Sequence, residues 1–129
     1  MRLGELERDV MERLWAVDGP VTVRAVHGAL AAERDLAYTT VMTVLDRLAK
    51  KGAVRRVREG KAYWYEPAAT RDEMVAGLMH EALAGAGDDR SAALVHFVGQ
   101  ASQEEATALR DALAAVDKRH AARRKDRLG

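Results

Sequence analysis

Hydroxyl and cationic side chains gather in residues 38–52, whose sequence is YTTVMTVLDRLAKKG. Placed at about 100° per residue, the period of a helix, the polar side chains fall on one face and the apolar ones on the other. Short hydroxyl side chains at the start of a helix can approach base edges and phosphates, while later Arg and Lys side chains can bind a guanine or the backbone. The residues that could bind DNA in this way are Thr39, Thr40, Thr43, Arg47, Lys50 and Lys51.

The apolar face of the same segment predicts how the helix is held. Its apolar side chains fall roughly 40° to 140° around the helix from Thr40, so we expect them to be buried. Gly52 follows the last turn, where a glycine commonly ends a helix. An ordinary amphipathic surface helix has the same apolar pattern, so this segment alone leaves a solvated helix and a DNA-binding helix both open. The side chains expected to be buried are Val41, Val44, Leu45 and Leu48.

A β-hairpin is expected directly after this helix. Residues 53–58 and 61–66 contain β-branched and aromatic side chains that favour strands, and Gly60 between them can form the turn. Basic side chains near the tip could lie along a phosphate backbone and contribute affinity without reading the sequence, as in the wing of a winged helix. The alternative is an edge hairpin whose charges protect it from aggregation. These basic side chains are Arg56, Arg58 and Lys61.

Two further helices are expected before the central one. Apolar residues four, four and three positions apart predict a first helix in residues 4–17, which residues 18–20 end. Thr22 is a suitable N-cap for a second helix, from Val23 to about residue 32. Two short helices in succession, the later one with the polar face, form the arrangement of a helix-turn-helix. The apolar stripe of the first helix is Leu6, Val10, Leu14 and Val17, with Trp15 beside it.

Beyond a hinge at residues 68–71 the sequence predicts only helices. Thr70, Ser91 and Ser102 are suitable N-caps, and Ser102 with Glu105 has the spacing of a capping box. Each helix has an apolar stripe that a helical unit of this size cannot bury by itself, so we expect pairing with a second copy of the chain. The residues expected at the interface between the copies are Met74, Leu78, Leu94, Phe97, Leu109 and Leu113.

The formal net charge is only +1, but the charges are distributed unevenly along the 129 residues. Residues 47–61 hold seven basic side chains and one acid, whereas residues 72–117 hold nine acids and two arginines. Such a distribution is expected if one part of the chain meets a polyanion and another part does not. Residues 118–129 hold six basic side chains and one acid. We interpret this end as solvated and frayed, and an auxiliary contact with nucleic acid is the alternative.

Several classes of function lack the residues that they need. The sequence has no cysteine, and its four histidines are scattered without metal-ligand spacing. It contains no phosphate-binding loop, nucleophile elbow or acid–base pair of carboxylates, so we expect no enzyme activity, no metal and no cofactor. The N-terminus lacks the pattern of a signal peptide and no apolar run is long enough to span a membrane, so we expect a cytoplasmic location.

The order of these elements, together with three local motifs, resembles the BlaI/MecI penicillinase-repressor family of bacterial winged-helix regulators. The motifs are LGELERDVMERLW at residues 3–15, YTTV with LDRLAKKG in the central helix, and YWYEP at residues 63–67. The likeness covers nearly the whole chain. It implies a mainly α fold with a small β-hairpin, in which residues 1–69 form a winged helix-turn-helix domain for DNA binding. Residues 70–129 would form a helical dimerisation domain with a basic tail.

The resemblance also implies a function. Proteins of this kind are homodimeric repressors that bind palindromic operators with TACA and TGTA half-sites and control β-lactamase or related antibiotic-response genes. Their equivalents of Thr39, Thr40, Thr43 and Arg47 enter the major groove, and the wing around residues 58–61 touches the backbone.

In the penicillinase branch, β-lactams act through a membrane receptor-protease, and induction follows cleavage of an Asn-Phe bond in the dimerisation region. The matching bond here is His96–Phe97, so this candidate cleavage position departs from the family at its first residue. The copper-responsive branch carries a Cys-x-Cys motif that this chain lacks, so copper sensing of that kind is not expected.

One function from another class stays open. A winged helix can also serve as a protein-interaction module, with its cationic face bound to an acidic partner, and the fold alone does not decide between the two. The two functions differ in whether the chain binds duplex DNA with a dependence on salt and a preference for sequence.

Overall fold

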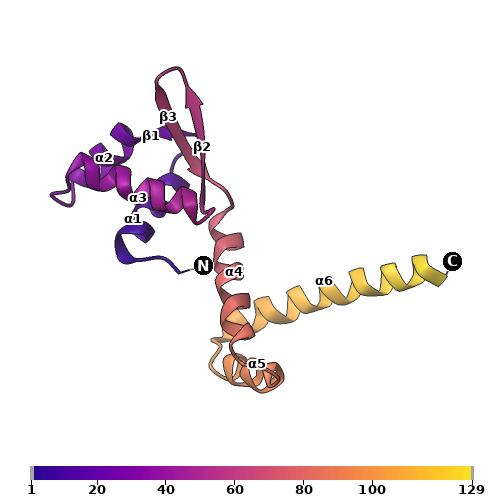
Figure 1. The fold of residues 1–129 in the computed structure, drawn as a ribbon. Coiled ribbons are helices and arrows are strands. Elements are labelled where there is room, and N and C mark those ends of the chain that lie inside the picture. Colours follow the sequence, from indigo (N-terminus) through magenta and orange to yellow (C-terminus); the bar gives the residue numbers. More distant parts are fainter. Residues whose placement is uncertain (1, 129) are drawn as a thin grey trace. The chain divides into compact units, whose positions relative to one another are not determined.

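The computed structural model describes residues 2–128 and confirms a mainly helical fold with a small antiparallel sheet (Figure 1). The elements are α1 (Glu5–Trp15), β1 (Val21–Thr22), α2 (Val23–Ala31), α3 (Tyr38–Lys50), β2 (Val54–Glu59), β3 (Ala62–Pro67), α4 (Arg71–Ala84), α5 (Arg90–Gly99) and α6 (Gln103–Leu128). Helices α2 and α3 form the predicted helix-turn-helix, and β2 with β3 forms the hairpin that follows it. Helices α1, α2 and α3 and the three strands together make a winged helix.

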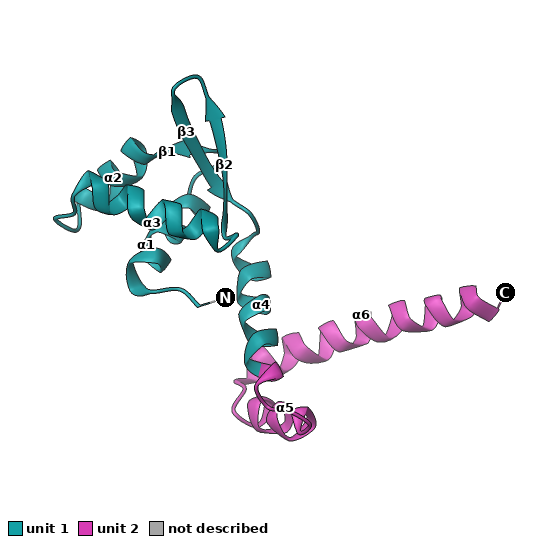
Figure 2. Ribbon diagram, viewed as in Figure 1, with its two compact units in different colours: residues 1–82 teal, residues 83–129 magenta. Residues whose placement is uncertain are grey.

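The chain forms two compact units, residues 1–82 and 83–129 (Figure 2). The first unit holds the elements from α1 to β3 and most of α4, and the second holds α5 and α6. The predicted boundary between residues 69 and 70 separates DNA binding from dimerisation. Compactness does not test that division of roles, so the boundary stays a prediction.

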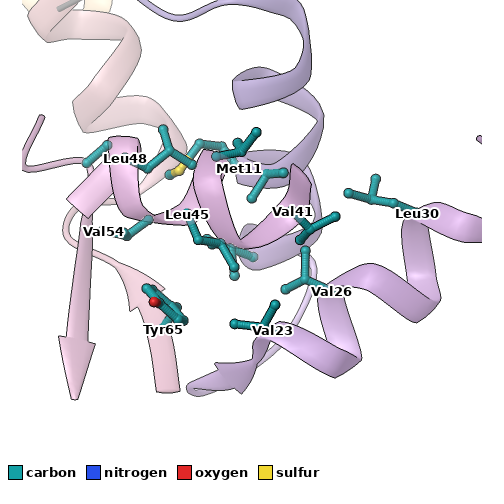
Figure 3. Packing of buried hydrophobic residues seen from close by; sticks show 13 residues of the cluster. Met11, Val23, Val26, Leu30, Val41, Leu45, Leu48, Val54 and Tyr65 are labelled. Atoms are coloured by element: carbon teal, nitrogen blue, oxygen red, sulfur yellow. The ribbon is translucent and has the colours of Figure 1, made fainter. Parts of the chain in front are cut away.

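Helix α3 lies at the centre of the core of the first unit (Figure 3). Its Val41, Leu45 and Leu48 are completely buried, and Val44 is nearly so, which confirms the apolar face predicted for this helix. Burying one such side chain contributes about 1.5–3 kcal/mol, so this contact sets the orientation of α3. Around α3 the core consists of Val10, Met11 and Leu14 from α1, Val23, Val26 and Leu30 from α2, and Ala53, Val54 and Tyr65 from the hairpin region.

The end of α3 has the geometry predicted for a glycine cap. Gly52 has a φ of +78°, which a residue without Cβ adopts readily. Its N–H donates to the carbonyl oxygen of Ala49 at 3.0 Å, and the N–H of Ala53 donates to that of Leu48 at 2.9 Å. These two bonds form a Schellman motif, which satisfies the last carbonyl groups of the helix.

Three of the four predicted N-caps are confirmed. The hydroxyl oxygens of Thr22, Thr70 and Ser102 each accept a hydrogen bond from the N–H three residues later. The N–H of Ser102 also donates to the carboxylate of Glu105 at 2.8 Å, which completes the capping box. The cap predicted at Ser91 is wrong, because α5 begins at Arg90 and Asp89, two residues before Ser91, stands at the capping position.

The sheet has the strand order β1-β3-β2, with antiparallel pairing throughout. Both hairpin strands begin and end one residue later than predicted, because the N–H of Ala53 already belongs to the end of α3. Strand β1 was not predicted. It consists of two residues, of which Val21 pairs with Tyr65, and a partner so distant in sequence leaves no local pattern.

Helix α1 is shorter than predicted. It begins at Glu5 and ends at Trp15, so Val17 lies beyond it and exposes 48% of its surface. The prediction of a buried Val17 is therefore wrong. Met11 is completely buried and supplies the side chain that the predicted stripe lacked.

Helix α6 continues to Leu128, so the expectation of a frayed end is wrong. Ala, Arg and Lys make up most of residues 118–128 and are good helix formers. Lys125 and Arg127 in the last turn also complement the negative end of the helix dipole. The side chains of this segment are exposed, as expected of a solvated end. Across residues 2–128, no helix is both long enough and apolar enough to cross a membrane.

The start of α4 is attached to α1. The indole N–H of Trp15 donates to the carbonyl oxygen of Ala69 at 3.0 Å. The Arg71 guanidinium forms an ion pair with Glu12 and lies over the Trp15 ring, 5.4 Å from its centroid. These contacts hold the chain where it leaves the hairpin.

Glu7 joins the start of α1 to the end of α3. Its Oε1 accepts hydrogen bonds from the N–H of Gly4 at 2.9 Å and from Nζ of Lys51 at 2.8 Å, and the residue is only 9% exposed. Burial raises the pKa of Glu7, but the hydrogen bonds from Lys51 and Gly4 and the positive charges of Lys51 and Arg47 together outweigh burial. The pKa is therefore held below its ordinary value.

We expect Glu7→Gln to lower the free energy of unfolding by about 1–2 kcal/mol at neutral pH, because the amide loses charge-assisted hydrogen bonds. The folded-state pKa is the lower one, so the carboxylate stabilises the fold above the unfolded-state pKa of about 4.5. This contribution is lost as the pH falls through the folded-state pKa. Urea unfolding of both proteins from neutral pH downwards measures the difference, which should close in acid. A difference that stays constant with pH would contradict this role of Glu7.

Candidate nucleic-acid interface

The face of α3 opposite the core is open to solvent. Val41, Leu45 and Leu48 are buried on one side of the helix, so the polar side must face the solvent. The structure therefore brings together on one exposed face the predicted residues Thr39, Thr40, Thr43, Arg47 and Lys50.

The first turns of α3 present hydroxyl groups to solvent. The Thr43 hydroxyl donates to the carbonyl oxygen of Thr39 at 2.9 Å, so its own oxygen can still accept a hydrogen bond. Ala37 stands at the N-cap position, and within residues 2–128 no side chain caps the first N–H groups of the helix. The N–H of Thr40 already donates to the carbonyl oxygen of Ala37 at 3.1 Å. The positive end of the helix dipole favours an anionic ligand at this end.

Arg47 lies near the middle of the exposed face. Over the described part of the chain, its guanidinium has neither a hydrogen bond nor an ion pair, although its charge acts on the carboxylate of Glu7. A guanidinium carries five N–H donors in a planar fork. Arg47 is thus equipped to bind two acceptors at once, as on the edge of a guanine.

Asp46 connects α3 to the hairpin. Its Oδ2 lies 3.0 Å from Nζ of Lys50, one turn later, and its Oδ1 lies 3.6 Å from Nη1 of Arg56 on β2. All three side chains are well exposed, so each pair contributes at most about 1 kcal/mol. The spacing of Asp46 and Lys50 predicts the first pair, whereas no local pattern predicts the second.

Lys51 has partners within the fold. Its ammonium group donates to the carboxylate of Glu7 and to the carbonyl oxygen of Arg2, both at 2.8 Å. These bonds hold the side chain against the N-terminal segment. The predicted contact of Lys51 with DNA stays a prediction, while its contact with Glu7 stabilises the fold.

The strand register decides which hairpin cations share a side with α3. Arg56 stands opposite Tyr65, and Arg58 stands opposite Tyr63. Residues two apart lie on the same face of a strand, and Tyr65 is buried in the core. The side chains of Arg56 and Arg58 therefore lie on the core-facing side of the hairpin. The tip of the hairpin extends beyond the helices of the winged helix (Figure 1).

The ring of Tyr63 contacts both of these arginines. Their guanidinium carbons lie 4.7 Å (Arg56) and 5.7 Å (Arg58) from the centroid of the Tyr63 ring. Nε of Arg58 also donates to the carbonyl oxygen of Gly60 at 3.2 Å. Lys61 follows in the turn and is exposed. The sequence predicted Tyr63 only as a strand residue, although its place opposite two arginines follows from the hairpin register.

The segment between α2 and α3 is tied to neighbouring helices. Nη2 of Arg34 lies 2.9 Å from Oε1 of Glu5 and 3.2 Å from Oδ2 of Asp9. Nε2 of His27 lies 2.7 Å from the carbonyl oxygen of Leu36. The sequence predicted only a connection here. In the structure these contacts set where the first turn of α3 begins.

Three of the six residues predicted for the interface between copies are exposed in the single chain, whereas Met74 packs against the core of the winged helix. Leu94, Phe97 and Leu113 expose 47%, 50% and 60% of their surface, and Met74, Leu78 and Leu109 are half-buried. Large apolar side chains exposed in groups mark surfaces that bind a partner. His96 and Phe97 lie in the last turns of α5, and both are exposed.

Three comparisons with known proteins show which proteins this chain is similar to. The profile of the family described as Penicillinase repressor matches residues 3–115. Two proteins from strains of Mycobacterium tuberculosis, each described as Transcriptional regulator BlaI, are 59% identical over 121 residues, which cover 92% of this chain and 88% of theirs. A solution structure of the DNA binding domain of the repressor BlaI is similar with a TM-score of 0.50 and 27% identity, covering 54% of this chain and 84% of that one.

Proposed function

Because the chain belongs to the penicillinase repressor family, we propose that it represses transcription by binding operator DNA through α3 and the cationic hairpin. The observation that carries this proposal is that Arg47 is exposed on the polar face of α3, while the exposed Arg56 of the hairpin is joined to the neighbouring Asp46 of the same helix at 3.6 Å. Membership in a repressor family confirms that the chain is a regulator and not an enzyme.

In this proposal α3 reads the bases. Thr39, Thr40 and Thr43 are short enough for the first turns of the helix to enter the major groove. The Arg47 guanidinium then reaches a base edge, and Lys50 contacts the backbone. The open donors of Arg47 among the described residues support its role, because an arginine already bound within the fold would lose those bonds on reaching DNA.

The hairpin contributes affinity without reading the sequence. Tyr63 keeps the guanidinium groups of Arg56 and Arg58 together on one side of the sheet. Two guanidinium groups fixed in this way can bind neighbouring phosphates, and the ammonium of Lys61 in the turn can bind another. The hairpin thus acts as the wing of the proposed DNA-binding unit.

A second copy of the chain completes the DNA-binding unit. The exposed Leu94, Phe97 and Leu113 supply apolar surface for pairing, together with Met74, Leu78 and Leu109. A two-fold dimer presents two α3 helices, so its operator is palindromic. The half-sites expected from the family resemblance are TACA and TGTA, in front of β-lactamase or related antibiotic-response genes.

Induction then requires loss of DNA binding. Following the family resemblance, a β-lactam-responsive receptor-protease would cut the dimerisation region, and the matching bond is His96–Phe97. Both residues are exposed, but they lie within α5, so the helix must open locally before a protease can bind it in extended form. Cleavage would remove the pairing between copies, and with it the simultaneous binding of two winged helices to one operator.

The reading role of Arg47 has a direct test. We expect Arg47→Ala to weaken binding to a duplex with inverted TACA and TGTA half-sites by about 1–3 kcal/mol, and to weaken binding to a mixed-sequence duplex much less. Arg8→Ala, a change of the same charge on the exposed side of α1, is the control and should leave both affinities nearly unchanged. Fluorescence anisotropy measures all four. An equal loss on both duplexes would show that Arg47 does not read a base.

The wing predicts a different pattern. Arg58→Ala and Lys61→Ala should weaken binding to both duplexes alike, and each should flatten the slope of log K against log salt by about one unit. Arg55→Ala serves as the control, because Arg55 lies on the other face of β2, where it pairs with Glu66 at 3.6 Å. If Arg55→Ala flattens the slope as much as Arg58→Ala, the core-facing side of the hairpin is not the one that meets the backbone.

Pairing through the C-terminal helices is tested by sedimentation. The wild-type chain should sediment as a dimer at micromolar concentration, and Leu113→Glu should shift it towards the monomer, because a carboxylate replaces an exposed apolar contact. Ala115→Glu adds the same charge to another face of α6 and should leave the dimer intact. A wild-type monomer, alone and on DNA, would exclude the proposed dimer.

A further inference from the structure

The last three turns of α6 carry a cationic surface that the proposed contacts of the winged helix leave unused. Positions alternately three and four residues apart line one face of α6, and we call this face the α6 seam. Its first four members are apolar, and three of these are half-buried. From His120 onwards every member is basic. The α6 seam consists of Ala106, Leu109, Leu113, Val116, His120, Arg123 and Arg127.

The basic part of the seam, together with Arg124, borders an open hollow of about 420 Å³. The hollow is lined by His120, Arg123, Arg124 and Arg127, and no carboxylate is among its lining residues. None of the three arginines forms an ion pair among the described residues, and Asp126, although it stands three residues after Arg123, does not line the hollow. Three guanidinium groups around one depression repel each other unless an anion lies between them.

Parallel pairing of α6 between two copies does not account for this basic surface. If two α6 helices pair through the apolar members of the seam in parallel, Arg123 and Arg127 of one helix meet the same cations of the other. The apolar contact therefore ends near Val116, and the turns beyond it are left open.

We propose that residues 119–127 of α6 bind the phosphate backbone of duplex DNA, in addition to the contact made by the winged helix. A planar guanidinium binds phosphate oxygens through two parallel hydrogen bonds, and three of them lie within five residues here. This inference rests on the proposed function, because the winged helix holds the duplex on the same molecule and so raises its effective concentration at α6. The helix contributes affinity and salt dependence but reads no bases.

The test compares two double variants of the full chain that change the charge equally. Arg123→Gln with Arg127→Gln removes two members of the basic seam, whereas Lys118→Gln with Lys125→Gln removes two cations from the opposite side of α6. The probe is a mixed-sequence duplex of about 60 base pairs, bound at several salt concentrations. Each phosphate that the protein no longer neutralises flattens the slope of log K against log salt by about 0.9, so the slope of the seam variant should flatten by about 1.8 per protomer. The lysine variant should keep the wild-type slope.

Three outcomes would overturn this inference. If the seam variant has the same slope as the lysine variant while Arg58→Ala still weakens binding, the winged helix binds DNA and α6 does not. If sedimentation instead shows that the seam variant dissociates the dimer at unchanged DNA affinity, the basic surface binds the acidic helices of a second copy. If the wild-type chain itself shows no salt-dependent binding, the proposed function fails together with this inference. Circular dichroism of both variants confirms that α6 is still formed.

Discussion

Burial of one face of α3 determines which of its side chains can meet a ligand. Val41, Leu45 and Leu48 have no exposed surface, so a rotation of the helix that uncovered them would cost about 1.5–3 kcal/mol for each side chain. The polar face therefore has one stable position. The Schellman motif at Gly52 and the contact between Glu7 and Lys51 fix the end of the helix. The hairpin begins directly after this end, so the end of the helix also sets where the hairpin starts.

The carboxylate of Asp46 lies within the cationic surface, where its negative charge repels an anionic ligand. Its contacts with Lys50 and Arg56 are exposed and therefore weak and screened by salt. Both cations can exchange Asp46 for a phosphate at little cost. The backbone of this surface is thus held by the core, while its cationic side chains can change partners. Arg47, which has no such partner among the described residues, does not need to exchange one.

Local patterns in the sequence predicted the elements and most of their ends. Helical period identified the buried face of α3, and residue type identified the caps at Thr22 and Gly52, because these features depend on neighbours within about four positions. The features that were missed depend on distant partners. Glu7 and Lys51 are 44 positions apart, β1 pairs with a strand more than forty residues later, and Asp46 and Arg56 lie on two different elements, beyond the reach of a helical repeat. The predicted DNA contacts and the predicted interface between copies concern partners outside the single chain, so they remain predictions.

Chemical-shift mapping tests the central claim most directly, namely that α3 and the hairpin form one DNA-binding surface. Backbone amide signals of the nitrogen-15-labelled full chain would be followed while a duplex with inverted TACA and TGTA half-sites is added. We expect the largest changes in the winged helix to fall together in residues 39–50 and 56–61, with the exposed side of α1 unaffected. Changes confined to α1 and the outer face of the hairpin, or no changes at low salt, would contradict this claim.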